Sequence, residues 1–198
     1  LNKATNSKYA QSKINGEIKI RENFDRATII KPSIIFSVDD NLSTRFMSLL
    51  SLFPFFPLYY NGSTKFTPIH AADVAELIFN VISKEIVSKD IEAIGPEILT
   101  FKEIIQILSK CIKKKRLLVP IPLFLAKISA MFFQLFPNPL LTIDQLRLLK
   151  YDNIKSENGI TNFDIGCPSK LYFEESVLKY SFNYTEGGQF SMKKNVKK

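Results

Sequence analysis

The sequence is poor in the residue types that build metal sites, disulfides and phosphate-binding loops. It contains one histidine, which excludes a metal centre built on several histidines. Its two cysteines, Cys111 and Cys167, are far apart in the chain, which fits a reducing compartment and argues against structural zinc. The 7 glycines nowhere form the pattern Gly-x-Gly-x-x-Gly of a phosphate-binding loop. We therefore expect no metal, and no glycine-rich phosphate loop within these residues.

A start methionine and a membrane-spanning run are also missing. The chain begins at Leu1, partway into a helix-start pattern, so we expect its 198 residues to be a fragment of a longer protein. Any signal or transit peptide would then lie upstream. The most apolar stretch, about residues 123–136, is too short and too interrupted by Lys127 and Gln134 to cross a bilayer.

Acidic residues are outnumbered, with 19 Asp and Glu against 27 Lys and Arg and a net charge of +8. Much of the excess is local, in a basic cluster at residues 113–116 and a lysine-rich tail at 193–198 that we expect to be disordered. No recognised nucleic-acid motif accompanies the charge, so we expect no nucleic-acid partner. An anionic membrane surface or an acidic partner explains the same charge.

A Tyr-x-x-x-Lys pair is present at the start of an expected helix, residues 7–23. Tyr9 and Lys13 are four residues apart, so on a helix they share one face. A lysine ammonium favours the phenolate form of a neighbouring tyrosine, and its donors can also reach ribose hydroxyls. By itself the motif is weak, because an ordinary exposed helix face has the same spacing, and a second copy occurs at Tyr151 and Lys155.

The context favours the first copy of the pair. A strand-like apolar run, residues 27–36, follows it, whereas the second copy lies in a polar stretch. A helix followed by a strand is the α/β context in which such a pair faces a nucleotide. Pro32 cannot donate to a sheet ladder and marks where the strand leaves the sheet, and ligands of open α/β sheets collect at such ends. A bulge at Pro32 and Ser33 without a ligand is the alternative.

Hydrophobic periodicity predicts several further elements. Helices are expected at residues 42–52, 71–83, 101–112, 123–136 and 142–150, with a last short one within 171–184. Extended segments are expected at 65–70, 91–94 and 117–122. The buried face of the helix at 71–83 is expected to carry Val74, Leu77, Ile78, Val81 and Ile82.

Two apolar stretches have two interpretations each. Residues 53–60 are broken by prolines, and we prefer a packed loop to an exposed partner surface. The helix at 123–136 is either a core helix, which we prefer, or an interfacial helix with residues 113–116 as its basic flank. His70 is expected to be a local hydrogen-bonding residue rather than a catalyst.

The order of these elements predicts an α/β fold, namely the C-terminal half of a doubly wound Rossmann domain followed by a mostly helical lobe. The half domain is expected at residues 1–110, with 37–67 as an inserted substrate-side loop and helix, and the lobe at 111–192. Half a doubly wound sheet exposes an unpaired strand edge, so we expect the 198 residues alone to aggregate.

The residues around the pair resemble a known superfamily. Tyr9-Ala-Gln-Ser-Lys13, with Gly16-Glu17 after it, is similar to the active-site helix of the extended and atypical short-chain dehydrogenases/reductases, which include the NAD-dependent epimerases and dehydratases. Lys31-Pro-Ser-Ile-Ile-Phe36 resembles the strand that follows that helix. The segments most similar to the nucleotide-binding accessory subunit family of respiratory complex I are residues 27–41, 66–75, 95–101, 120–124, 141–153, 163–166 and 187–190, of which those from 141 onward are similar to the bacterial members.

The resemblance implies an NAD(P)-binding fold in which Tyr9 and Lys13 form the active-site pair. Lys13 would hold the nicotinamide ribose, and the nicotinamide would be lined by Pro32, Ser33 and Ile34. The resemblance also implies that the bound NAD or NADP is structural, because the complex I subunit is regarded as an accessory protein. The substrate-side candidates are Asn41, Arg45 and His70.

Two functions from different classes remain compatible with these residues. The first is a non-catalytic NAD(P)-binding accessory subunit or assembly factor of NADH:quinone oxidoreductase. It would contact other complex I subunits near the quinone module and a membrane surface through residues 113–136, on the cytoplasmic face of a bacterial inner membrane or the matrix side of a mitochondrial one. The second is a freestanding, soluble NAD(P)-dependent oxidoreductase or epimerase, with Tyr9 as general acid/base and Lys13 as its activator. We prefer the first function, and a binding module with a relic pair is a third interpretation.

Overall fold

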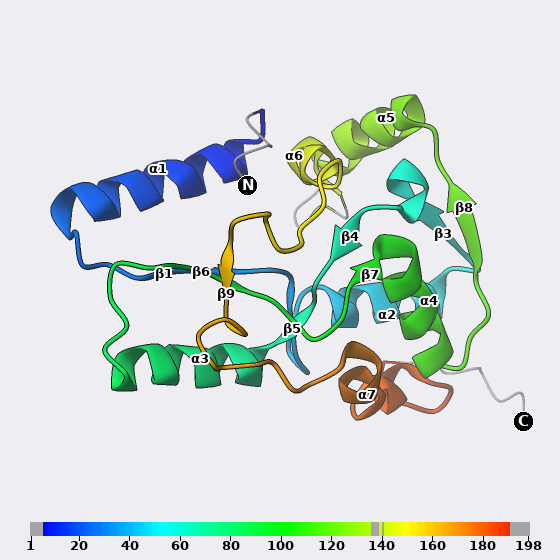
Figure 1. Ribbon diagram of the computed structural model, residues 1–198. Coiled ribbons are helices and arrows are strands. Elements are labelled where there is room, and N and C mark those ends of the chain that lie inside the picture. The colour runs from blue at the N-terminus through cyan, green and yellow to red at the C-terminus, as the bar shows by residue number, and fades with distance from the viewer. Residues whose placement is uncertain (1–5, 136–138, 140, 191–198) are drawn as a thin grey trace, which may run out of the picture.

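Figure 1 shows the computed structural model of the chain, which describes residues 6–135, 139 and 141–190. The basic tail expected at residues 193–198 therefore lies outside the described residues. The description that follows concerns the described ranges alone.

Parallel strand pairing organises the first part of the chain. Strand β1 (Ile29–Pro32) pairs in parallel with β6 (Asp90–Ala93), and β6 pairs in parallel with β9 (Ile160–Thr161). Figure 1 shows helix α1 (Lys8–Asn23) along one face of these strands and helix α3 (Ala71–Ser83) along the other. Helices on both faces of a parallel sheet are the doubly wound arrangement, so the expected fold class is confirmed.

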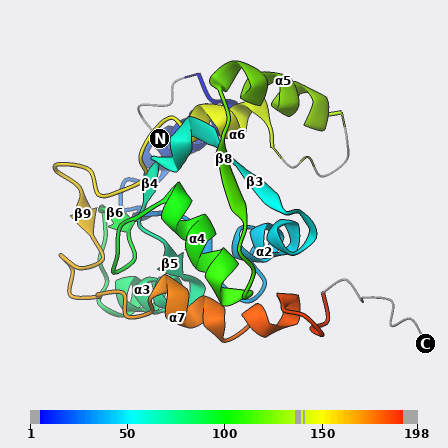
Figure 2. The same ribbon diagram turned by 90° about the vertical axis from the view of Figure 1, so that its right-hand side faces the viewer.

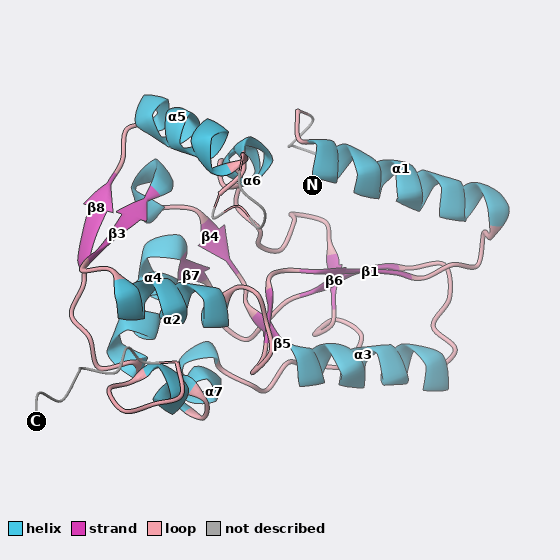
Figure 3. Cartoon of the chain, turned by 180° about the vertical axis from the view of Figure 1, so that it is seen from behind, coloured by secondary structure: helices cyan, strands magenta, loops and turns pink. Residues whose placement is uncertain are grey.

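The chain then changes strand partners and enters a second group of elements. Strand β2 (Ile35–Phe36) pairs in parallel with β5 (Ile69–His70), and β4 (Lys65–Phe66) pairs antiparallel with β7 (Leu99–Thr100). Figure 3 shows these short strands leading away from β1 and β6 toward helices α2 (Ser43–Leu52), α4 (Phe101–Cys111) and α7 (Phe173–Leu178). The largest apolar core lies among these helices, and its fully buried side chains include Phe36, Met47, Leu50, Ile105, Leu108 and Val177.

Residues 53–60 are not the packed loop that we preferred. They form strand β3 (Phe55–Leu58), which pairs in parallel with β8 (Leu117–Pro120), and then the 3₁₀ turn η1 (Tyr59–Gly62). Buried Phe56 and Leu58 alternate with less buried neighbours, as a strand requires. Pro57 is tolerated because β3 has one strand partner, which leaves its other edge open for a residue that lacks an N–H.

The helix expected at 123–136 is not a core helix. Helix α5 (Leu123–Phe133) buries Ala126 and Ala130, whereas Phe124 is 71 % exposed and Leu135, just beyond the helix, is 80 % exposed. Figure 2 shows α5 at one end of the molecule, beside the short helix α6 (Ile143–Leu148). The sequence misled us because large apolar side chains surround the whole helix, while the described neighbours cover only its alanine stripe.

The outward side of helix α3 is also less buried than expected. Leu77 and Val81 are buried and Val74 is half-buried, but Ile78 and Ile82 are exposed. Within the described residues, the elements packed against α3 therefore cover only part of its apolar stripe.

Beside β3, strands β7 and β9 were also not predicted. Strands β7 and β9 have two residues each, which is too short for periodicity to reveal. Strand β9 comes from the stretch that we assigned to the helical lobe, yet it extends the sheet of the half domain. The domain boundaries at 110 and 192 stay a prediction. The last predicted helix is present as α7, followed by the turn η2 (Ser181–Tyr184).

Gly95 marks a close backbone crossing between the segment after β6 and the segment before β5. A Cβ atom at Gly95 would lie 1.6 Å from the carbonyl oxygen of Pro68. Because backbone atoms cannot move aside cheaply, we expect Gly95→Ala to lower the free energy of unfolding by about 3 kcal/mol. Denaturant-induced unfolding of the natively expressed protein measures this change.

Gly16→Ala is the matched control for this substitution. Gly16 lies inside helix α1, and a Cβ atom there has no neighbour within 4 Å. Because alanine favours a helix more than glycine does, we expect it to raise the free energy of unfolding by roughly 0.5–1 kcal/mol. Equal effects of the two substitutions would contradict the close crossing at Gly95.

Candidate nucleotide site

The Tyr-x-x-x-Lys pair lies in the first turns of helix α1. Ser7 is the N-cap of this helix, and its hydroxyl accepts a hydrogen bond from the N–H of Ala10. The Lys13 ammonium lies over the Tyr9 ring, with Nζ 5.6 Å from the ring centroid. The two side chains therefore share one helix face, in the distance range of a cation–π contact.

Both side chains of the pair are accessible. Tyr9 is 51 % exposed, and its hydroxyl makes no hydrogen bond within the described part of the chain. Lys13 is exposed and pairs with no carboxylate of the described residues. The phenol and the ammonium are thus free to donate to hydroxyl or carbonyl groups of a ligand, as the nicotinamide end of a dinucleotide requires.

A distant carboxylate completes the N-terminus of helix α1. Helix α1 has no acidic residue in its first turn, and Asp144 of α6 takes that place. Its Oδ1 accepts from Lys8 N at 2.9 Å, and its Oδ2 accepts from Tyr9 N at 3.1 Å and from Ser7 Oγ at 2.9 Å. These N–H groups have no partner within their own helix, so Asp144 both satisfies them and complements the helix dipole.

Ion pairs rather than apolar contacts attach the middle of helix α1 to the sheet. Lys31 of β1 pairs with Glu17 at 2.7 Å, and Arg21 pairs with Asp90 of β6. The apolar residues Ala10, Ile14 and Ile18 lie four residues apart along the helix, and of these Ala10 is buried, Ile14 is half-buried and Ile18 is exposed. The stripe is only partly covered because β1 is the outermost strand of the described sheet.

The end of strand β1 holds a buried serine with a structural task. Ser33 N donates to Ala93 O at 2.9 Å, and Ser33 Oγ donates to Asn153 O at 3.1 Å and accepts from Thr67 N at 3.2 Å. Its hydroxyl is therefore already used as a donor and as an acceptor. Pro32 is exposed at the carboxyl end of the strand, and Ile34 is half-buried. Of the residues expected to line a nicotinamide, Ser33 therefore has a hydroxyl that is already engaged within the protein.

The substrate-side candidates lie at the starts of two helices. His70 is the N-cap of α3 and its Nδ1 accepts from Ala72 N at 3.1 Å, which confirms a local hydrogen-bonding role. Burial lowers the pKa of His70 and so favours the neutral ring. Arg45 of α2 donates to the carbonyl of Pro139, and Asn41 is exposed in the loop before α2. A contact of these three with a substrate stays a prediction.

The second Tyr-x-x-x-Lys copy does not form a helix-face pair. Residues 151–155 are not helical, and Lys155 Nζ instead pairs with Asp164 at 3.3 Å. The preference for the first copy is therefore consistent with the structure.

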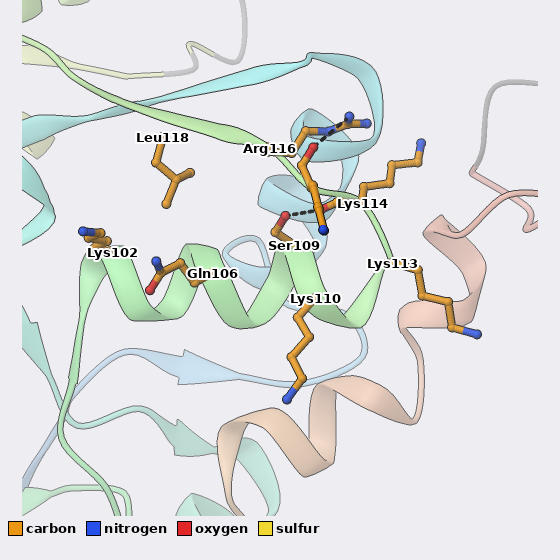
Figure 4. A pocket seen from close by; sticks show the side chains of 9 residues that line it. Lys102, Gln106, Ser109, Lys110, Lys113, Lys114, Arg116 and Leu118 are labelled. Carbon is orange, nitrogen blue, oxygen red and sulfur yellow. Dashed lines mark hydrogen bonds between the residues drawn. The ribbon is translucent and has the colours of Figure 1, made fainter.

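A basic groove lies far from the pair, between helix α4 and strand β8. Its volume is about 560 Å³, and its lining includes the basic cluster at residues 113–116 (Figure 4). Lys114 Nζ donates to Ser51 O and Arg116 Nε to Leu50 O, so both groups satisfy carbonyls at the end of α2. Figure 4 shows Lys110 pointing away from Arg116, and it pairs with Glu174. Lys110, Lys114 and Arg116 thus bind other parts of the protein instead of converging on one ligand.

The described residues hold no cluster of three or more His, Cys, Asp or Glu side chains that could bind a metal ion. Both cysteines are buried and unpaired, and burial raises the pKa of the Cys111 thiol to about 11. Within the same residues no helix has the length and apolarity that a bilayer crossing needs.

Comparison with known proteins gives relatives of low identity over most of the chain. No protein-family model matches the sequence. The chain is 25% identical over 194 residues to the mitochondrial NADH dehydrogenase [ubiquinone] 1 alpha subcomplex subunit 9 of Arabidopsis thaliana, with 92% of this chain and 48% of the relative covered. It is 27% identical over 189 residues to the same subunit of Dictyostelium discoideum, with 93% and 52% covered. The chain spans about half the length of the curated relatives it matches.

Solved structures share the fold. A dTDP-glucose 4,6-dehydratase from Bacillus anthracis, in complex with NAD, matches with a TM-score of 0.61 and 14% identity over 88% of this chain and 51% of that one. A UDP-glucose 4-epimerase from Thermus thermophilus, also in complex with NAD, matches with a TM-score of 0.56 and 10% identity over 84% and 50%. The expected resemblance to complex I accessory subunits and to the fold of epimerases and dehydratases is therefore confirmed.

Sequence reasoning missed Asp144. The segment Leu141–Leu146 carries a helix-start signal, because Thr142 and Gln145 form a capping box. That signal could have placed Asp144 in the first turn of a helix. It could not show that the carboxylate reaches helix α1, because 135 residues separate Asp144 from Tyr9.

The contacts of Asp144 predict how stability depends on pH. Burial alone would raise the pKa of this carboxyl, but the hydrogen bonds from the first turn of α1, with Arg147 nearby, outweigh it and lower the pKa. A carboxyl with a lowered folded-state pKa stabilises the fold above its unfolded pKa of about 3.9, and this contribution is lost as the pH falls through the folded value. We expect Asp144→Asn to be less stable than wild type at pH 7 and to converge with it in strong acid.

Denaturant unfolding across a pH series measures this dependence. Glu103→Gln is a suitable companion variant, because Glu103 is the carboxylate of the capping box of helix α4 and its pKa is lowered by hydrogen bonds from Thr100. A stability difference between Asp144→Asn and wild type that stayed constant down to strong acid would contradict the contacts of Asp144.

Proposed function

We propose that the protein is an NAD(P)-binding accessory subunit or assembly factor of NADH:quinone oxidoreductase, in which the nucleotide is structural. The observation that carries the proposal is the similarity to named subunits of this complex over 92% and 93% of the chain. The fold supports it, because NAD-bound dehydratases and epimerases share it. Because the chain matches only about half of the length of these relatives, the partners of the whole protein are part of the proposal.

The residues of the pair fit the nicotinamide end of a dinucleotide. Lys13 has an ammonium without a carboxylate partner among the described residues, and it would hold the ribose hydroxyls. Pro32 and Ile34 would lie against the nicotinamide, which when bound supplies a hydride donor or acceptor. None of these contacts distinguishes NAD from NADP.

A second candidate function is a freestanding NAD(P)-dependent oxidoreductase or epimerase. The observation that favours it is the intact pair, with the Lys13 ammonium over the Tyr9 ring and the phenol unengaged within the described residues. Tyr9 would then be the general acid/base and Lys13 its activator.

The location of the protein is part of the proposal. We place it on the peripheral side of the complex, near the quinone module, with helix α5 against the membrane surface. Helix α5 exposes Phe124, Ile128 and Met131 together with the charged Lys127, a combination that suits an apolar interior beside anionic headgroups. The basic cluster at 113–116 and helix α5 lie at opposite ends of strand β8 (Figure 2), so we assign the membrane contact to α5 alone.

Two substitutions separate a structural nucleotide from a catalytic one. Because Lys13 would hold the ribose, we expect Lys13→Ala to lower both the NAD(P) content of the purified protein and the amount of assembled complex on a native gel. Tyr9→Phe keeps the ring and the helix, so we expect unchanged NADH:quinone reductase activity per assembled complex.

The alternatives give different results in the same experiment. If the protein is a freestanding enzyme, Tyr9→Phe costs about two or more decades in turnover of its own substrate, and the protein does not co-migrate with the reductase activity. An unchanged amount of complex in cells that lack the protein would reject the accessory-subunit proposal.

The membrane contact has a test with a matched control. A charge at Phe124 would be buried in the apolar part of the interface, so we expect Phe124→Glu to reduce flotation of the protein with vesicles that contain anionic phospholipid. Phe79→Glu on helix α3 is the control, because Phe79 is 69 % exposed and Phe124 71 %. Equal losses with both variants, or a loss with neither, would remove α5 as the contact.

A further inference from the structure

The N–H groups in the first turn of helix α1 bind a residue that is far away in the sequence. These N–H groups have no partners inside the helix, and the sequence places no acid in that turn. Asp144 supplies both carboxylate oxygens to Lys8 N, Tyr9 N and Ser7 Oγ. Such charge-assisted hydrogen bonds are stronger and more directional than neutral ones.

A second charged residue of helix α6 holds the same turn. Arg147 Nη1 donates to Asn6 O at 2.9 Å and lies 3.8 Å from Asp144 Oδ1. Helix α6 therefore binds both kinds of backbone group at the start of α1. The Asp144 carboxylate accepts from the N–H groups of Lys8 and Tyr9, and the Arg147 guanidinium donates to the carbonyl of Asn6.

Helix α6 is itself fixed by packing against α5. Leu146 of α6 is buried in one cluster with Ala126 and Ala130 of α5 and with Tyr59. The capping box of Thr142 and Gln145 fixes where α6 begins. The position of Asp144 is thus set by the contact between α5 and α6, not by the sheet that supports α1.

We propose that Asp144 is a positioning residue for the nucleotide, which fixes the turn that carries Tyr9 and, one turn later, Lys13. This inference rests on the proposed nucleotide-binding function. It makes the contact between helices α5 and α6 a support of the nucleotide site, because α6 carries Asp144 and packs against α5. By linkage, a nucleotide held by Lys13 also stabilises the contact between α6 and α1.

Binding of NADH and NADPH to the natively expressed protein tests this role. Because loss of the carboxylate frees the first turn of α1, we expect Asp144→Ala to raise the dissociation constant about tenfold, measured well below the unfolding temperature of the variant. Glu103→Gln is the control, because it alters a carboxylate cap on helix α4, and we expect it to leave the dissociation constant unchanged. The double variant Asp144→Ala/Lys13→Ala is expected to bind no more weakly than Lys13→Ala alone, because Asp144 acts on the nucleotide through Lys13.

A second readout follows the linkage in the opposite direction. In wild type, added NADPH or NADH is expected to slow amide hydrogen exchange in residues 141–149, and in Asp144→Ala this protection is expected to be absent. A residue that only stabilised the fold would change exchange equally with and without nucleotide.

The outcomes distinguish a failure of the positioning role of Asp144 from a failure of the proposed nucleotide binding. If wild type binds neither dinucleotide, the proposed function fails. If wild type binds one and Lys13→Ala weakens it, while Asp144→Ala binds as wild type does, the inference alone is overturned. If Asp144→Ala does not fold, Asp144→Asn and Ser7→Ala take its place, since each removes part of the same hydrogen bonds, and unchanged binding by both would overturn the inference equally.

Discussion

The fold depends on the point between strands β1 and β2, where the chain changes from one strand partner to another. Strand β1 pairs with β6 as far as Pro32 and Ala93, and from Ile35 onward the chain pairs with β5 instead. Ser33 lies between the two pairings, and its N–H and hydroxyl bind the segments that separate there. A buried hydroxyl that lost these partners would leave unsatisfied groups at a cost of about 1–3 kcal/mol. The carboxyl end of the sheet, where a dinucleotide would lie, is thus built on hydrogen bonds that the chain has already made.

Helix α1 is attached to this sheet and to the second group of elements by charged groups. Its partners are Lys31 and Asp90 in the strands and Asp144 at its N-terminus. Its apolar residues Ile18 and Phe24 are exposed in the described part of the chain. Exposed ion pairs contribute little to stability, so the geometry of the helix relies most on the hydrogen bonds at its first turn. The two residues of the pair lie in that turn and the one after it.

Local signals in the sequence were sufficient for much of the fold. The helices that begin near Ser7, Ala71 and Phe101 are set by neighbours three or four residues away, and all three were predicted. Burial was harder to predict, because the face that a helix covers depends on partners distant in sequence. The predictions that α5 is a core helix and that the outer residues of α3 are buried were wrong for this reason. Strand β9 and the reach of Asp144 to α1 arise only from tertiary contacts, which one sequence does not contain.

An intact Tyr-x-x-x-Lys pair does not by itself require catalysis. Holding a ribose needs hydrogen-bond donors on a helix of fixed position, and Lys13 with the Asp144 contacts provides them. Acid/base catalysis needs, in addition, a phenol from which water is excluded. Tyr9 is half exposed, and its hydroxyl is engaged by no other described residue. The described residues therefore supply the donors that holding a ribose needs, and the same pair is compatible with turnover.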